Sequence, residues 1–219
     1  MADNSWKEYF NKKVEENKGD LGSSDYFNEK SFYMQRENTL KWLGNLEGKV
    51  ILDAGCGVGL FSEPLVKNNE VYGADFAEKA LEYAGKRGLK TICGDITKLP
   101  VENDKFDVVI CIGVIQLIED HKKLIQELHR VTKPGGILLI ETLNKHSLQR
   151  KIYMLVNRTK KFDKMYDKIE LKKEFEAIGF KNVEFMNMYH PFSHVGYSDR
   201  DGIFTKYFST SFAIKAVKG

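Results

Sequence analysis

Short apolar runs alternate along this chain with stretches whose apolar residues recur at helical spacing. The runs occupy residues 50–53, 70–75, 90–93, 106–111 and 136–140. Continuous apolar runs are typical of strands that are buried on both faces of a parallel sheet. Helical spacing between such runs predicts helices that connect the strands. The pattern therefore predicts an α/β fold with a doubly wound sheet.

Three connecting helices can be outlined from the same pattern. We expect one to begin at about residue 60, after the first strand. The helix after the second strand has Ala77, Ala80, Leu81 and Ala84 on one face. We expect another to be N-capped by Asp120 and to end before Pro134 and Gly135. Its sheet-facing residues are Leu124, Leu128 and Val131. His121 and His129 lie on this helix, and we interpret both as surface or packing residues rather than catalytic ones.

The first strand ends in Asp53 and runs directly into a turn with glycines at positions 55, 57 and 59. Glycine lets a backbone turn sharply and approach a ligand closely. A dinucleotide fingerprint needs G-x-G-x-x-G, but its third position is Leu60 or Ser62 here. An acid at the strand end would also repel a pyrophosphate, whereas S-adenosylmethionine has no phosphate and carries an ammonium and a sulfonium. The turn therefore favours S-adenosylmethionine over a dinucleotide.

The next two strands also end in acids, Asp75 and Asp95. An ionised carboxylate only accepts hydrogen bonds, so Asp75 can take both hydroxyls of a ribose and Asp95 an adenine amine. Singly, each acid also fits an ordinary helix N-cap. Open α/β sheets bind ligands beyond the carboxyl ends of their strands, where all three acids would lie. Together they favour a nucleoside site.

Five motifs in order carry a family resemblance. V-I-L-D-A-G-C-G-V-G, V-Y-G-A-D, C-G-D-I, F-D-V-V-I-C and K-P-G-G, over about residues 40–142, resemble the class I S-adenosylmethionine-dependent methyltransferases. The resemblance implies a Rossmann-like, doubly wound, mostly parallel seven-stranded sheet with an antiparallel C-terminal strand and a helical cap. It implies a cofactor site made of Arg36, Asp53, Gly55, Cys56, Gly57, Asp75, Phe76, Gly94, Asp95, Ile96 and Ile112.

The resemblance also implies a role for several of these residues. Asp53 and Gly55 would line the methionine end of S-adenosylmethionine, Asp75 would hold the ribose, Asp95 and Ile96 would meet the adenine, Ile112 would lie against the cofactor, and Arg36 would reach the methionine carboxylate. Within the family the chain looks most like ubiquinone- and menaquinone-type enzymes. It departs from them at Gln116-Leu117, where they have Glu-His, and at Ala77, where the family usually has serine.

We expect residues 1–219 to form a single methyltransferase domain in four parts. These are an N-terminal helical lid (1–45), a cofactor-binding core (46–142), a basic helical cap (143–180) and a C-terminal hairpin (181–219) with strands at 182–189 and 209–217. The first part is rich in aromatic residues, namely Trp6, Tyr9, Phe10, Tyr26, Phe27, Phe32 and Tyr33. Their rings either close over a bound nucleoside and an apolar acceptor or simply cover the sheet.

The positive charge gathers in one segment. Residues 145–173 hold ten Lys or Arg against three acids, while the formal charge of the whole chain is +3. Leu148, Ile152 and Leu155 form an apolar stripe in this segment, with basic residues opposite. Such a helix fits an anionic substrate, peripheral contact with a lipid headgroup surface, or an ordinary solvated face.

The remaining composition fits a cytoplasmic protein. Cys56, Cys93 and Cys111 are odd in number and lack metal-ligand spacing, so we expect reduced thiols and no metal site. The first residues contain no apolar signal core, and the longest apolar run, 108–115, is too short to span a bilayer. We therefore expect no transmembrane segment.

These features predict a methyltransferase that acts on a small-molecule acceptor, with oxygen as the preferred target. We expect no nucleic-acid partner, because the charge is low and no (Asp/Asn)-Pro-Pro-aromatic loop follows the fourth strand. The general base stays open among His146, His190, His194 and Tyr189, with His146 and His190 as the candidates. Two alternatives remain, a nucleotide-cofactor oxidoreductase and a non-catalytic cofactor-binding regulatory protein.

Overall fold

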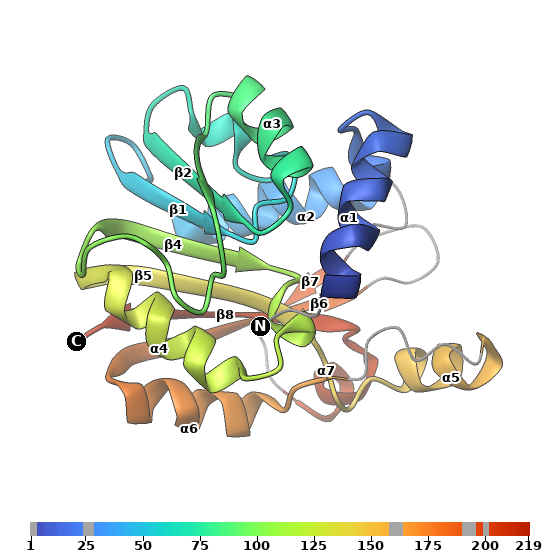
Figure 1. Cartoon of the computed structure of the whole chain (residues 1–219). Helices are drawn as coiled ribbons and strands as arrows, with labels where there is room; N and C mark the ends of the chain where they lie inside the picture. Colours follow the sequence, from blue (N-terminus) through green and yellow to red (C-terminus); the bar gives the residue numbers. More distant parts are fainter. Residues whose placement is uncertain (1–3, 24–28, 158–163, 190–195, 199–201) are drawn as a thin grey trace.

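The chain forms one twisted eight-stranded sheet with helices on both faces (Figure 1). The computed structural model describes residues 4–23, 29–157, 164–189, 196–198 and 202–219. The strand order is β3-β2-β1-β4-β5-β8-β6-β7. The strands are β1 Val50–Ala54, β2 Glu70–Asp75, β3 Lys90–Cys93, β4 Phe106–Ile112, β5 Thr132–Leu143, β6 Phe180–Tyr189, β7 Gly196–Ser198 and β8 Ser211–Lys218.

The first five strands are parallel neighbours, and β8 runs antiparallel between β5 and β6. The prediction of a mostly parallel, Rossmann-like sheet with an antiparallel C-terminal strand is confirmed. Beyond the seven predicted strands, the three-residue β7 pairs with β6 and forms an eighth strand at the edge. The order reverses between β1 and β4, so the connections leave a gap at that point.

Helices cover the two faces of the sheet as two layers. The first face carries α4 (His121–Val131) and α6 (Lys168–Ile178), whose apolar side chains join one core cluster. The opposite face carries α2 (Glu29–Leu43) and α3 (Glu78–Lys86), which join a second cluster. The remaining helices are α1 (Asn4–Asn17), α5 (Leu148–Asn157), α7 (Ile203–Phe208) and the 3-10 turns Leu21–Ser23, Glu63–Leu65 and Ile115–Leu117.

The helix before β5 has the cap that its sequence predicts. The Lys123 N–H donates to the Asp120 carboxylate at 3.0 Å. His121 contacts Glu174 at 2.9 Å, and the His129 ring packs edge-on against Phe180. Both histidines are therefore packing residues, as the sequence indicates.

The helix expected from about residue 60 is wrong. The chain instead makes turns there and a single 3-10 turn at Glu63–Leu65. Pro64 has no N–H to donate to the Leu60 carbonyl, which is the bond that an α-helix would need. Arg36 from α2 donates to that carbonyl instead, with 2.9 Å between Nη1 and the oxygen.

The C-terminal strands pair as expected but are not joined by a tight turn. β6 and β8 are antiparallel neighbours, with Met188 opposite Ser211. The chain between them forms β7 and α7. Their strands also extend to residues 180 and 218, slightly beyond the expected ranges.

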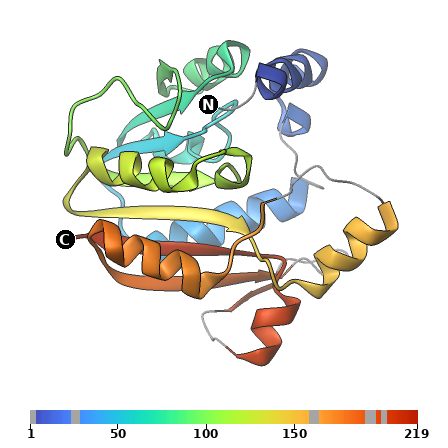
Figure 2. The same cartoon turned by 60° about the horizontal axis from the view of Figure 1, so that its bottom comes forward.

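Residues 143–180 divide into two parts that behave differently. α6 packs against the sheet and α4, and Leu171 and Phe175 are fully buried. α5 instead stands away from the sheet, at the end where the parallel strands finish (Figures 1 and 2). Among the described residues, no helix combines the length and the apolar character that crossing a membrane requires.

Candidate active site

The turn after β1 brings bare backbone to the point where the strand order reverses. Gly55, Gly57 and Gly59 have φ values of +80°, +51° and +82°, in the left-handed region that favours glycine. A Cβ on Gly55 would lie 2.5 Å from Cγ2 of Val114, whereas a Cβ on Gly57 would have nothing within 4 Å. The turn is thus packed on one side and open on the other, as a ligand cradle needs to be.

Asp53 is a buried carboxyl directly below this turn. Its side chain is 2% exposed, and the Ser62 hydroxyl donates to Oδ2 at 2.7 Å. Burial raises the pKa of Asp53 to about 7, the Ser62 bond opposes this, and the nearby charge of Asp75 adds to it. A cation beside Asp53 would stabilise its ionised form.

Asp75 ends the neighbouring strand and is bonded to the same turn. Its Oδ2 accepts the Gly57 N–H and its Oδ1 accepts the Ala77 N–H, each at 2.9 Å. Burial raises the pKa of Asp75, and these backbone bonds oppose the shift. Each carboxylate oxygen has two acceptor sites, so capacity remains for a ligand hydroxyl. The Ala77 N–H therefore has a hydrogen-bond acceptor, although this position lacks the serine that is usual in the family.

Arg36 reaches the far end of the glycine turn from α2. Its guanidinium bonds the Leu60 carbonyl and lies 4.8 Å from the centre of the Tyr33 ring. Its Nε is buried, and no described group accepts its hydrogen. A buried donor without an acceptor is costly, so this atom fits an anionic ligand group beside the turn.

The residues expected at the adenine lie where β2 and β3 end. The Gly94 N–H donates to the Asp75 carbonyl at 3.0 Å. Asp95 Oδ1 accepts the N–H and hydroxyl of Thr97, and these bonds lower the pKa of Asp95 although burial opposes them. Ile96 is buried in the core. The segment after β3 is therefore held in a fixed loop beside Asp75.

A cluster of rings covers Phe76, which follows Asp75. Phe10 of α1 meets Phe76 edge-on, with 6.4 Å between ring centroids, and stacks with Trp6. Val14 of α1 is buried against the turn and α3, together with Val58, Ala77 and Ala80. The aromatic part of α1 thus lies over α3 and the expected nucleoside end rather than on the strands.

Three cysteines lie near the site, and burial raises the pKa of two of them, Cys56 and Cys111. Cys56 and Cys111 are buried, Cys93 is exposed, and none forms a disulfide. Burial, together with the charges of Asp53 and Asp75, raises the pKa of Cys56 far above its ordinary value. Since the thiolate is the reactive form, this environment does not activate Cys56 as a nucleophile.

A third buried acid, Glu141, lies at the end of β5 and has no role in the sequence prediction. It is 5% exposed and stands opposite Ile112 of β4 and Ala213 of β8. Burial raises its pKa, while the Ser211 hydroxyl, the charge of Arg150 and the Gly113 N–H oppose the shift. The signal in the sequence was the same as for Asp53, an acid that ends an apolar strand.

The two histidines proposed as bases fall in different places. His146 follows β5, and its Nε2 lies 2.6 Å from Asp167, which also caps α6. The His146 ring also meets Tyr207 of α7. The structure thus brings His146 to α6 and α7. His190 and His194 lie outside the described residues.

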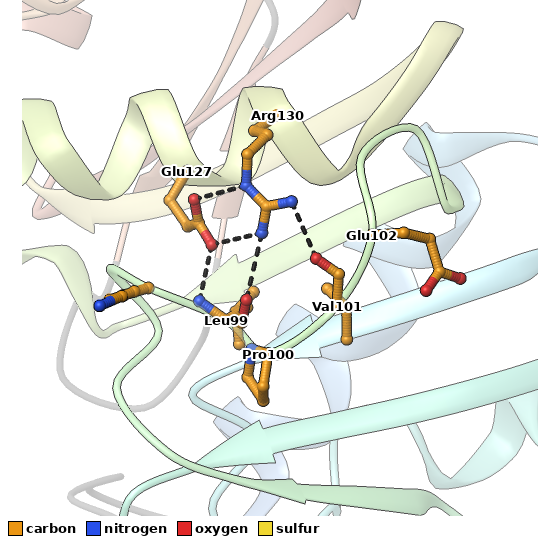
Figure 3. A pocket seen from close by; sticks show the side chains of 7 residues that line it. Leu99, Pro100, Val101, Glu102, Glu127 and Arg130 are labelled. Carbon is orange, nitrogen blue, oxygen red and sulfur yellow. Dashed lines mark hydrogen bonds and ion pairs between the residues drawn. The ribbon is translucent and has the colours of Figure 1, made fainter.

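A surface hollow between α4 and the loop after β3 is lined by polar groups that bond to one another (Figure 3). Glu127 accepts the Leu99 N–H at 2.6 Å, and Arg130 donates to the Leu99 and Val101 carbonyls. Glu127 and Arg130 also pair with each other at 2.7 Å. These bonds fix the loop that carries Asp95, so we interpret the hollow as a structural clamp.

The core of the chain matches a known family. Residues 52–140 fit the family model described as "Methyltransferase domain". This segment is a methyltransferase domain. It holds the strand tips at Asp53, Asp75 and Asp95 and ends just before Glu141, so the resemblance read from the motifs is confirmed.

Two relatives show the range of similarity. An uncharacterized protein of Methanocaldococcus jannaschii is 32% identical over 136 residues, which are 61% of this chain and 65% of that protein. A ubiquinone biosynthesis O-methyltransferase of Bordetella bronchiseptica is 35% identical over 111 residues, 47% of this chain and 46% of that enzyme. The matches thus span about half to two thirds of the relatives' lengths.

Solved structures share the fold. The magnesium protoporphyrin IX methyltransferase of Synechocystis, solved with S-adenosylhomocysteine, is similar with a TM-score of 0.74 at 20% identity, covering 99% of both chains. A protein of Thermotoga maritima described as a possible histamine N-methyltransferase has a TM-score of 0.72 at 20% identity, covering 87% of this chain and 90% of that one. At this identity the likeness shows a shared Rossmann-like fold.

Proposed function

We propose that the protein is an S-adenosylmethionine-dependent methyltransferase that acts on a small molecule, with oxygen as the methylated atom. One observation carries the proposal. Asp53 lies near the end of β1, beside the reversal of the sheet order, and Asp75 ends the adjacent strand β2. Asp75 accepts the Gly57 N–H of the turn that follows β1, and Asp53 accepts the hydroxyl of Ser62 just after that turn. This places two acids around one bare backbone edge.

The residues present fit the cofactor. In the proposed complex Asp75 accepts the ribose hydroxyls, the Asp53 carboxylate faces the positive end, and Arg36 donates its unmatched Nε hydrogen to the methionine carboxylate. Phe76, Gly94, Asp95 and Ile96 border the adenine, and Gly55, Cys56, Gly57 and Ile112 line the remainder. These assignments extend the family resemblance to the geometry of this chain.

Bound S-adenosylmethionine supplies a methyl group on a positively charged sulfur. The protein's own part is to align this group with an acceptor and to exclude water, and good alignment contributes about 7–11 kcal/mol to such reactions. The packed turn, the buried acids and the ring cluster of α1 are suited to both tasks. We propose that residues 1–45 act as the lid of this site.

Ligand-induced stabilisation tests the cofactor assignment against the oxidoreductase alternative. S-adenosylhomocysteine at 100 times its dissociation constant would stabilise the fold by about 2.7 kcal/mol, which raises the melting temperature measurably. We expect this shift with S-adenosylhomocysteine and none with NAD. The opposite pattern would reject the proposal in favour of an oxidoreductase.

The acceptor assignment rests on the relatives and the charge. Relatives that match the core are named O-methyltransferases, and the formal charge of +3 is too small for a phosphate-tracking surface. We therefore propose an oxygen acceptor on a small molecule, apolar or anionic, and no nucleic acid. Single-turnover transfer of a labelled methyl group to small hydroxyl compounds separates this enzyme from a non-catalytic regulator, which would retain the label on the cofactor.

We also propose that α5 rests on an anionic membrane surface. Its apolar side chains point to solvent, with Ile152, Leu155 and Val156 exposed by 62%, 81% and 73%. The opposite side of the helix faces the body, where Arg150 bonds the Thr210 carbonyl at 2.8 Å. An outward apolar stripe in a segment rich in lysine and arginine matches an interfacial helix.

Vesicle sedimentation tests this contact. We expect binding to phosphatidylglycerol vesicles, weaker binding to phosphatidylcholine, and loss of binding in Leu155→Asp. Ile169→Asp is the matched control, because Ile169 is 65% exposed on α6 in the body of the protein. Equal binding of Leu155→Asp and the parent protein would contradict the proposal.

We also propose a cytoplasmic location, because the exposed thiol of Cys93 fits a reducing compartment.

A further inference from the structure

Glu141 is a buried ionisable group that cofactor binding does not use. It lies two strands from Asp53, because β4 separates β1 from β5. The sheet register puts Asp53 beside Ile110 and Glu141 beside Ile112. Glu141 is therefore displaced from Asp53 across the sheet and also outward along the strands. It lies on the side of β1 opposite to Asp75.

Unmatched polar atoms surround this carboxyl. Both Glu141 and Gln116 lie near the space beside the Gly113 Cα, because a Cβ there would be 3.8 Å from Glu141 Oε2 and 3.8 Å from Gln116 Nε2. Gln116 Nε2 donates to the Gly113 carbonyl, but its Oε1 is buried with no donor among the described residues. The Ser211 hydroxyl approaches Glu141 without forming a full hydrogen bond. Buried polar atoms rarely stay unpaired, so this space fits a polar ligand.

We propose that Glu141 is the general base of the reaction and that Gln116 and Ser211 complete a subsite for the acceptor hydroxyl. The inference rests on the proposed function, because it needs a methyl donor in the neighbouring site. Met188 of β6 stands opposite Ser211 and is fully buried, so the subsite has an apolar wall. The occupant is a hydroxyl on an apolar body, such as a phenol.

The step balances in charge and in protons. Glu141 enters as a carboxylate and takes the hydroxyl proton while the acceptor oxygen forms its bond to the methyl carbon. The bond from that carbon to sulfur breaks, and its electron pair stays on sulfur, which becomes neutral. Glu141 is left as the neutral acid and returns the proton to water.

The surroundings of Glu141 suit a base that must gain and lose a proton. Arg150 of α5 favours the carboxylate, while burial favours the neutral acid. Cys111 of β4 lies within electrostatic range, and its buried thiol is neutral. His146, in contrast, pairs with Asp167, the N-cap of α6.

Two phenols of different acidity test the assignment in the full-length chain. Catechol keeps its protons near neutral pH, whereas the nitro group of 4-nitrocatechol ionises one hydroxyl without help. A general base accelerates such a reaction about 10²- to 10⁴-fold, so kcat with catechol should fall by that factor in Glu141→Gln. With 4-nitrocatechol, kcat should fall by under ~10-fold. Glu141→Asp should recover part of the catechol rate.

Two measurements that need no catalytic turnover distinguish whether Glu141 is a base, a structural residue or a cofactor-binding residue. By calorimetry, Glu141→Gln should bind S-adenosylhomocysteine as the parent protein does. In NMR spectra of protein with ¹³C-labelled glutamate carboxyls, the Glu141 signal is the one that is missing from Glu141→Gln. This signal should shift when 4-nitrocatechol is added to the S-adenosylhomocysteine complex. Glu184→Gln is the matched control, because Glu184 is an exposed acid of β6 paired with Lys215.

Any outcome other than these overturns the inference. Equal losses with both phenols would make Glu141 structural, and weaker S-adenosylhomocysteine binding would make it part of the cofactor site. A parent protein that binds S-adenosylhomocysteine but methylates neither phenol would refute the subsite and leave the proposed function standing. Failure to bind S-adenosylhomocysteine would instead refute the proposed function.

Discussion

Asp53 is held in an environment that opposes its charge. Burial and the neighbouring Asp75 raise its pKa to about 7, and only the Ser62 hydroxyl favours ionisation. A carboxyl whose folded pKa is above its ordinary value destabilises the fold as pH rises from about 4 through 7. A cation bound beside Asp53 would reverse this penalty, so we propose that Asp53 links the charge of the cofactor to its own protonation.

This link predicts a pH-dependent affinity for S-adenosylmethionine. Below the pKa of about 7, binding must remove a proton from Asp53, so the affinity should fall about tenfold per pH unit and level off above pH 7. Asp75 shifts in the same direction, and the Cys56 and Cys111 thiols stay neutral. Calorimetry between pH 5.5 and 8.5 in buffers of different ionisation enthalpy measures the affinity and the proton release.

Two controls isolate the contribution of Asp53. Methylthioadenosine carries no positive charge, so its affinity should change little over the same pH range. Asp53→Asn should flatten the pH profile of S-adenosylmethionine. A profile that keeps its slope in Asp53→Asn would assign the protonation to another group.

Single residues were predictable where one local rule decides them. Asp53 and Asp75 follow from an acid at the end of an apolar strand, and Asp120 follows from helix capping. Glu141 obeys the first rule, but its neighbour in the sheet is Ala213 of β8, far along the chain. That pairing cannot be read from the local pattern.

At the scale of the element, the turn after β1 depends on its first glycine. Gly55 combines a φ of +80° with a Val114 methyl group 2.5 Å from its missing Cβ. Gly55→Ala should therefore destabilise the fold by more than the roughly 1–2 kcal/mol that the left-handed backbone costs an L-residue. Chemical denaturation measures the loss.

Gly44→Ala provides the matched control. Gly44 has a φ of +87° and nothing within 4 Å of the position of a Cβ. It should show the backbone cost alone and leave S-adenosylhomocysteine binding unchanged. Equal destabilisation by the two substitutions would show that the contact with Val114 is unimportant.

Element boundaries were predictable only where local signals agree with tertiary contacts. The strands and α4 appear where their patterns indicate. The helix expected from residue 60 does not form, because Pro64 lacks a donor and Arg36 takes the Leu60 carbonyl. Arg36 comes from a helix that precedes the whole sheet, so its effect on this turn is invisible in local sequence.

At the scale of the molecule, Arg87 joins α1 to the candidate site. Its Nη2 donates to the Gly19 carbonyl after α1 at 3.1 Å, and its Nη1 donates to the Val58 carbonyl of the glycine turn at 3.0 Å. The proposed lid and the turn therefore share one side chain at the end of α3.

Arg87→Ala should loosen the lid and the turn together. We expect faster amide exchange in α1 and weaker binding of S-adenosylhomocysteine, since loss of a charged hydrogen bond typically costs about 1.5–3 kcal/mol. Hydrogen exchange followed by mass spectrometry measures the first effect. Lys67→Ala, at an exposed site, is the control, and unchanged exchange in α1 would contradict this coupling.

The overall architecture was predictable because alternating strands and helices admit few topologies. The sequence also contains the apolar stripe of α5, but its outward orientation follows from the Arg150 bond to Thr210 near β8. The edge strand β7 and helix α7 have no signal of comparable strength. Long-range contacts therefore account for most of what the sequence did not reveal.

Calorimetric titration of Asp75→Ala with S-adenosylhomocysteine tests the central claim most directly. Deleting a charged acceptor should weaken binding by about 1.5–3 kcal/mol, or roughly 10- to 150-fold in the dissociation constant. Glu70→Ala, at the exposed start of the same strand, should bind as the parent protein does. Equal dissociation constants for Asp75→Ala and the parent protein would contradict the account.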